Sequence, residues 1–279
     1  MSPRGASVFI LVFVFVSMLC GTFSMPSFVS KRLCENCVEN KHTNSWDYLL
    51  FVNEWPESFC KFYNASHGHD KKAEKKCVIP PSVSTWTIHG TWPKKTGTKG
   101  PTSCNNTWQF KLSQIKDLVP VLNKTWPGLL TAKEYWSFWL HEWDNHGTCA
   151  ASLPVLHGEH NYFDKTLQLK QQHNIDKILS SSGIIPSSTV KYTREKILES
   201  VKNATGGMPN LICFQENHEQ SGSDFKQYLQ EIRMCLDKSL QPFDCPESEC
   251  MHLTMAYSSP CSSKTPIALP PLTTGNTVV

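Results

Sequence analysis

The cysteines constrain this chain more than any other feature of its sequence. Twelve cysteines occur among 279 residues, and all but Cys20 lie beyond residue 24. So many cysteines are typical of an exported protein whose fold is held together by disulfide bonds. Eleven is an odd number, so at least one cysteine has no partner within the chain after residue 24. A free thiol and a disulfide-linked dimer both stay open.

The first 24 residues predict a secretory signal peptide. One basic residue, Arg4, precedes an apolar run from 8 to 19, and the small residues Thr22 and Ser24 follow it. This run of about 12 residues is too short for a membrane anchor, because a spanning helix needs roughly 20. We therefore expect cleavage near Ser24 and no membrane span. Residues 25–279 are expected to form a single domain with a loosely ordered C-terminal tail from about residue 262.

Other features of the sequence agree with export. Each glycosylation sequon is a short motif with a real chance rate, and we expect at least two of the four to carry glycan: Asn64, Asn105, Asn123 and Asn203. The formal net charge of +3 excludes a histone-like polycation. The predicted location is extracellular, and an endolysosomal compartment stays open.

Helical and strand patterns are mixed without a regular order, which predicts an α+β fold. Strands are expected at 48–52, 85–89, 209–214 and 228–236, and helices at 113–124, 133–145, 162–173 and 194–202. We expect Gly90 and Pro93 to end the second strand, Pro120 to kink or shorten the first helix, and Gly147 to cap the second helix.

A tryptophan-rich window carries three histidines that could face one another. Seven of the nine tryptophans lie between Trp86 and Trp143. Strand alternation places His89 on the face opposite Trp86 and Ile88. A helix at about 100° per residue places four polar residues in one sector about 140° wide: His141, Glu142, Asn145 and His146. The sequence therefore predicts one cleft lined by imidazoles, a carboxylate and an amide.

This set suits RNA cleavage by the substrate's own 2′-hydroxyl. The reaction needs a base for the hydroxyl proton, an acid for the leaving 5′-oxygen and donors for the charged phosphorane. Histidine can fill both proton roles, and the two should come from different segments, as His89 and His146 do. Trp92 offers a flat surface on which a base could stack.

Two alternative interpretations compete with this one. A lone histidine is more often structural than catalytic, and tryptophans are more often core residues than base platforms. The pair His141-Glu142 also resembles the start of the zinc motif HExxH. Asn145 stands where that motif needs its second histidine, so we expect no metal and no other cofactor.

Two segments, 86–93 and 138–149, closely resemble the active-site motifs of the ribonuclease T2 family, WTIHGLWP and FWxHEWxKHGTC. The segment from Trp55 to Cys60 is similar to that family's early WP…C segment, and Cys104 and Cys149 match its cysteines beside the site. The resemblance covers about residues 45 to 262. It implies a single-domain ribonuclease T2-type fold, in which helices pack on an antiparallel sheet.

The resemblance also implies a role for each site residue. His146 would be the general base and His89 the general acid, and they would exchange roles when water opens the 2′,3′-cyclic phosphate. His141 would bind the phosphate, and Glu142 would orient the site and balance its charge. No metal would be needed.

The resemblance also implies which residues bind the bases, and this chain departs from the family motif at two positions. Trp92 would stack on the first base, and Phe138 would line the second base site. Asn145 replaces the usual lysine beside the last histidine, which predicts activity that is retained but lowered. Lys94 stands where some members have an acidic residue, so base preference is left open; Lys94 or Lys95 could compensate for the missing cation.

The resemblance further suggests four disulfides: Cys60–Cys77, Cys104–Cys149, Cys213–Cys261 and Cys235–Cys245. Cys250 is a rival partner in the last pair, and Cys34 and Cys37 are additional cysteines that could form a structural or an intermolecular bridge.

The sequence as a whole predicts a secreted, glycosylated endoribonuclease that acts on single-stranded RNA and not on DNA, with an acidic optimum. The alternative is a secreted glycoprotein effector that binds a receptor, through its glycans or its surface, with weak or lost catalysis.

Overall fold

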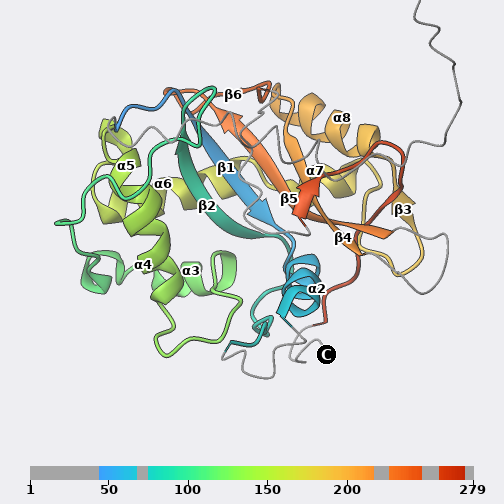
Figure 1. Cartoon of the computed structure of the whole chain (residues 1–279), viewed down its shortest axis with the longest axis horizontal. Coiled ribbons are helices and arrows are strands. Elements are labelled where there is room, and N and C mark those ends of the chain that lie inside the picture. The colour runs from blue at the N-terminus through green and yellow to red at the C-terminus, as the bar shows by residue number, and fades with distance from the viewer. Residues whose placement is uncertain (1–43, 68–74, 217–225, 247–257, 274–279) are drawn as a thin grey trace, which may run out of the picture.

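A computed structural model of the chain describes residues 44–67, 75–216, 226–246 and 258–273 (Figure 1). The predicted signal peptide and Cys34, Cys37 and Cys250 lie outside these residues. The strands are β1 Tyr48–Glu54, β2 Thr87–Lys94, β3 Lys191–Tyr192, β4 Asn210–Glu216, β5 Lys226–Leu236, β6 Pro242–Phe243, β7 Ser258–Pro260 and β8 Ile267–Ala268. The helices are α2 Pro56–His67, α3 Val119–Thr125, α4 Ser137–Glu142, α5 Thr148–Ala150, α6 Glu159–Gln172, α7 Ile175–Ser181 and α8 Arg194–Thr205.

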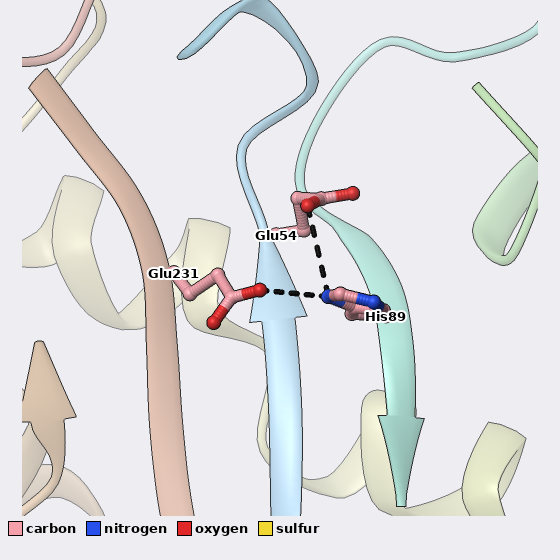
Figure 2. Close-up of side chains that lie close together, drawn as sticks. All are labelled: Glu54, His89 and Glu231. Atoms are coloured by element: carbon pink, nitrogen blue, oxygen red, sulfur yellow. Dashed lines mark hydrogen bonds and ion pairs between the residues drawn. The ribbon is translucent and has the colours of Figure 1, made fainter. Parts of the chain in front are cut away.

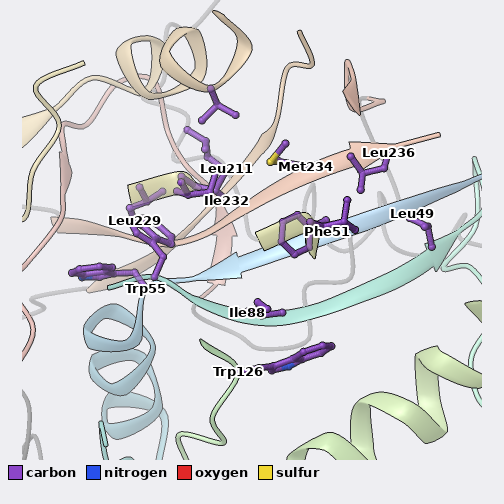
Figure 3. Close-up of a cluster of buried hydrophobic side chains, with 14 of the residues drawn as sticks. Leu49, Phe51, Trp55, Ile88, Trp126, Leu211, Leu229, Ile232, Met234 and Leu236 are labelled. Atoms are coloured by element: carbon purple, nitrogen blue, oxygen red, sulfur yellow. The ribbon is translucent and has the colours of Figure 1, made fainter. Parts of the chain in front are cut away.

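The fold is α+β, and its central sheet has the strand order β2-β1-β5-β4-β7. These neighbours pair antiparallel, whereas β8 pairs parallel with β5, so the sheet is mixed. One face of the sheet carries the main core, which includes Phe51, Ile88 and Ile232 from three adjacent strands (Figure 3). Buried polar bonds also join helix α6 to this face, where Lys170 Nζ donates to Asn53 Oδ1 at 2.9 Å.

The opposite face of β1, β2 and β5 combines apolar and charged side chains. Leu50, Val52 and Trp92 form a small buried cluster there with Cys235. Strand alternation from Cys235 places Arg233 and Glu231 on the same face. This face therefore holds the charged groups that surround His89.

The structure corrects three details of the predicted elements. Strand β2 does not end at Gly90 but continues to Lys94, because its backbone stays paired with β1. Gly147 does not cap the C-terminus of a helix, since it has φ −59° and the helical winding continues to Ala150. The described tail is packed and not loose: Leu269 is buried, and the carbonyl of Pro270 accepts a hydrogen bond from Trp55.

The four expected disulfides are confirmed: Cys60–Cys77, Cys104–Cys149, Cys213–Cys261 and Cys235–Cys245. The Cys104–Cys149 bond ties the segment after β2 to helix α5, directly beyond His146. It thereby fixes one wall of the site described next.

Candidate active site

A bulge in strand β2 sets the direction of His89. Val52 pairs with Gly90 and Asn53 pairs with Ile88, so His89 is an extra residue with no partner in this ladder. The bulge places His89 and Gly90 on the charged face of the sheet, where strict alternation would separate them. The carbonyl of His89 accepts a hydrogen bond from Trp126 Nε1 at 2.9 Å, which holds the bulge from behind.

Two carboxylates from neighbouring strands surround the His89 ring (Figure 2). Glu231 Oε1 lies 2.7 Å from Nδ1, and Glu54 Oε1 lies 3.7 Å from the same atom. Arg233 holds the second oxygen of Glu231, with Nε at 2.6 Å and Nη2 at 2.5 Å. An ionised carboxylate can only accept a hydrogen bond, so Nδ1 carries a hydrogen and Nε2 is directed away from the carboxylates.

The buried charges around His89 strongly shift its proton affinity. Burial alone would lower the pKa of His89, but the charge of Glu54 and the hydrogen bond and charge of Glu231 raise it to about 9. Burial also works to raise the pKa of Glu231, but Arg233 and His89 outweigh it and hold that pKa at about 2. Glu54 lacks such an arginine contact, and burial raises its pKa to about 8. His89 is therefore a cation at neutral and acidic pH.

Helix α4 and the π-helical turn Trp143–Gly147 bring the second histidine to β2. Glu142 is 1% exposed, and its Oε2 accepts a hydrogen bond from Trp92 Nε1 at 2.9 Å. Burial raises the pKa of Glu142 to about 7. The rings of His89 and His146 lie 4.8 and 5.2 Å from the ring of Trp92. Trp92 thus adjoins both histidines.

The four polar residues that were predicted to share one helix sector face two different directions in the structure. Glu142 and His146 face β2, whereas Asn145 turns toward the segment that follows β2. Its Nδ2 donates to the His141 carbonyl at 2.9 Å and lies 3.1 Å from His141 Nδ1, and its Oδ1 accepts from Ser103 Oγ at 3.0 Å. The helical wheel assumed uniform α-helical winding, and the wider π turn after Glu142 breaks that assumption. Burial and the charge of His89 lower the pKa of His141.

The residues expected to bind bases lie close to His89. The ring of Phe138 is 5.8 Å from that of His89. Trp92 is only 9% exposed, which leaves little open ring surface for a base. Lys94 Nζ and the Arg233 guanidinium each lie 5.7 Å from the centre of the Trp92 ring. Lys95 turns away and donates to Ser45 Oγ, so it does not replace the missing lysine at Asn145.

Comparison with known proteins decides the family. The model of the Ribonuclease T2 family matches residues 46–245. The chain belongs to the ribonuclease T2 family. Ribonuclease Oy of Magallana gigas is 37% identical over 232 residues, which cover 83% of this chain and 99% of the relative. The crystal structure of human RNase T2 has a TM-score of 0.63 and 30% identity, over 81% of this chain and 99% of that chain.

A further solved relative carries a nucleotide. RNase NT in complex with 5′-AMP matches with a TM-score of 0.63 and 27% identity, covering 82% of this chain and all of that chain. Because it belongs to the ribonuclease T2 family, this chain is an endoribonuclease of the ribonuclease T2 type. Among its described residues, no helix is long and apolar enough to cross a membrane.

Sequence reasoning missed three residues of this ribonuclease's site: Glu54, Glu231 and Arg233. The sequence pattern could have indicated two of them, because Glu231 and Arg233 alternate with apolar residues in a strand that is almost wholly buried. Ligand atoms of Glu54, His89 and Glu231 all lie within 4.8 Å of one another, close enough to share a metal ion. We interpret them as a hydrogen-bonded ion network, because Glu231 already bonds His89 and Arg233.

Gly90 permits the contact between Trp92 and Glu142. A Cβ atom at position 90 would lie 2.1 Å from both Glu142 Oε2 and Trp92 Nε1. The variant Gly90→Ala is therefore expected to lose about 1–3 kcal/mol of unfolding free energy, as overpacked sites do, and to displace the Trp92 ring. Urea unfolding and the near-ultraviolet circular dichroism of the folded variant measure both effects. Gly97→Ala would not serve as the control because its φ is positive; Ser113→Ala, an exposed site, would.

The shifted pKa values predict that this ribonuclease is most stable in mild acid. Glu54 and Glu142 bind protons more tightly when folded, so their contributions are full below pH 4.5 and are lost as the pH rises through about 8 and about 7. His89 loses its contribution between pH 6.5 and about 9. Glu231 acts oppositely, and its contribution is lost as the pH falls from 4.5 to about 2.

The melting temperature should therefore be highest near pH 4.5 to 5 and fall steadily up to about pH 8. Lys170 opposes this fall above pH 7, because burial lowers its pKa to about 7. Calorimetry from pH 3 to 8 checks the trend, and Glu142→Gln should flatten it between pH 4.5 and 7. A melting temperature that rises from pH 5 to 8 would contradict the assignment.

Proposed function

We propose that this enzyme cleaves single-stranded RNA by metal-independent transphosphorylation, with His89 as general acid and His146 as general base. One observation carries the proposal: a histidine held as a cation by the ionised Glu231 lies on one side of Trp92, and a second histidine lies beside the same ring. A cationic imidazole is the form that a general acid needs before the reaction starts.

The proposed reaction moves two protons. His146 accepts the proton of the 2′-hydroxyl while O2′ attacks phosphorus, and the bond from phosphorus to O5′ breaks. His89 Nε2 gives its proton to O5′, so the products are a 2′,3′-cyclic phosphate and a 5′-hydroxyl. Water then opens the cyclic phosphate with the two histidines in reversed roles. DNA lacks the 2′-hydroxyl and should not react.

His141 and Asn145 together take the place that a lysine fills in the family motif. Asn145 Nδ2 lies 3.1 Å from His141 Nδ1, and donation to this atom would require a neutral imidazole with its hydrogen on Nε2. The lowered pKa of His141 favours that neutral form. His141 would then offer one N–H donor to the phosphorane, and Asn145 would act as a positioning residue. A neutral donor stabilises the phosphorane less than a cation does, in line with lowered activity.

Export and glycosylation form part of the same proposal. Three sequon asparagines are exposed in the structure, Asn105, Asn123 and Asn203, and Asn64 is half-buried in helix α2. The four disulfides require an oxidising compartment for their formation. The predicted stability in mild acid suits either an acidic vesicle or secretion through one.

The deciding experiment is cleavage of a single-stranded RNA at pH 5 in EDTA. The expected products are 2′,3′-cyclic phosphates that open slowly, and the all-deoxy strand of the same sequence should stay intact. Loss of activity in EDTA that zinc restores would contradict the proposal. Failure of the well-folded enzyme to cleave would favour the receptor-binding effector, which no described contact supports.

A further inference from the structure

A polar hollow lies on the side of helix α4 that faces the segment after β2. Its volume is about 480 Å³, within the range of sites for small molecules. His141 stands in its wall and also belongs to the proposed phosphate site, so the two are continuous. The described residues that line it are Ser103, Asn105, Asn106, Gln109, Ser137, Leu140, His141, Asp144 and Asn145.

The hollow is rigid because its loop is fixed to the helix at several points. The Cys104–Cys149 disulfide joins the two walls covalently. The backbone N–H of Ser103 donates to the Asn145 carbonyl at 3.0 Å, and Ser103 Oγ donates to Asn145 Oδ1 at the same distance. The loop thus has its shape before any ligand arrives, which lowers the entropic cost of binding.

The lining chemistry suits a nucleoside better than a phosphate. Asn106 and Gln109 supply side-chain amide donors and acceptors that can pair with the edges of bases or with ribose hydroxyls. Within the loop, Gln109 Nε2 donates one hydrogen bond to the Asn106 carbonyl, and Asn105 Oδ1 accepts from the Thr107 N–H and hydroxyl, so Asn105 offers only its Nδ2. Among the described lining residues none is a lysine or an arginine, and the carboxyl group of Asp144 disfavours an anion. Of the described lining residues, His141 is the one whose side chain can carry a positive charge toward a phosphate, and it lies on the side shared with the proposed active site.

We propose that this hollow is an additional RNA subsite, which takes the nucleoside of a nucleotide beyond the cleaved pair. The phosphate that joins this nucleotide to the pair would pass His141. This inference rests on the proposed function, because it needs RNA to cross the same helix that carries His141 and His146. It makes the enzyme favour longer strands over dinucleotides.

Kinetics on short substrates of defined length test the subsite. Each substrate carries one ribonucleotide among 2′-deoxynucleotides, so only one bond can be cleaved, and it is extended by two residues on the 5′ or the 3′ side. One of the extensions should raise kcat/KM over the dinucleotide. The double variant Asn106→Ala/Gln109→Ala should lower kcat/KM for the favoured extended substrate by about three- to tenfold, as expected for one or two lost hydrogen bonds. It should leave kcat/KM for the dinucleotide unchanged. Gln171→Ala, an exposed glutamine on α6, is the matched control.

A glycan on Asn105 would cover the hollow, because that side chain is part of its wall. The assays therefore use the full chain produced in a bacterial periplasm, which adds no glycan at this sequon and keeps the hydrogen bond from Thr107 Oγ1 to Asn105 Oδ1. A gain with length that the double variant abolishes supports the subsite. A gain that the double variant leaves intact, or no gain with length, overturns it, although dinucleotide cleavage would still uphold the proposed function. No cleavage of any substrate would instead refute the proposed function itself.

Discussion

Replacing His89 or His146 with alanine is expected to lower kcat/KM for single-stranded RNA at pH 5 by about 10²–10⁴-fold, the usual contribution of a general acid or base. Each variant removes one of the two proton transfers that the proposed mechanism needs. His89 is held by Glu231 on one side, and His146 packs against Trp92 on the other. Product analysis by phosphorus NMR should show that the residual cleavage still yields the 2′,3′-cyclic phosphate, and that this product opens more slowly than with the wild type because the same two histidines serve the second step.

The double variant His89→Ala/His146→Ala shows whether the two histidines act in the same step or independently. If His89 and His146 act in one concerted transfer, losing both should cost little more than losing one. His160→Ala is the matched control, because His160 is exposed and pairs only with Asp117 among the contacts described for it. A loss below tenfold in either single variant, with the fold intact, would rule out the acid–base assignment.

The local chemistry of the two motifs was predictable from the sequence, and their orientation was not. Spacing and residue type selected His89, Glu142 and His146, which the structure brings together around Trp92. Their catalytic roles stay predictions. The bulge that turns His89 toward the charged face depends on pairing between β1 and β2, which no pattern in one strand reveals. Likewise, the π turn after Glu142 could not be found from a helical wheel, since the wheel assumes uniform α-helical winding.

Long-range partners were the main gap in the sequence-based prediction. Glu231 lies 142 residues from His89, and sheet pairing alone makes them neighbours. The disulfides were predicted correctly because a family resemblance carries long-range information that composition lacks. The tail was misjudged because proline and threonine suggested a loose segment, whereas Thr273 donates two hydrogen bonds to the buried Glu57. The described part of the tail is ordered by its contacts with buried residues, which the local composition does not reveal.

Replacing Glu231 with glutamine is expected to lower kcat/KM at alkaline pH and to leave it nearly unchanged at acidic pH. The variant loses the charge beside Nδ1, so the pKa of His89 should move from about 9 toward its ordinary value of 6.5. At pH 8 the protonated fraction of His89 would fall from about 0.9 to as little as about 0.03, so kcat/KM would fall by up to about 30-fold. At pH 5 both forms are protonated, and the loss should stay below about twofold.

The shape of this profile separates positioning of a charged acid from simple damage to the fold. A structural defect would lower kcat/KM at all pH values alike, whereas a changed pKa of His89 leaves the acidic limb in place and moves the alkaline limb downward. Glu216→Gln is the matched control, because Glu216 also accepts a hydrogen bond within the sheet, from the Tyr228 hydroxyl, and should leave the profile unchanged. An alkaline limb that stays near pH 9 in Glu231→Gln would mean that Glu54 alone keeps His89 charged.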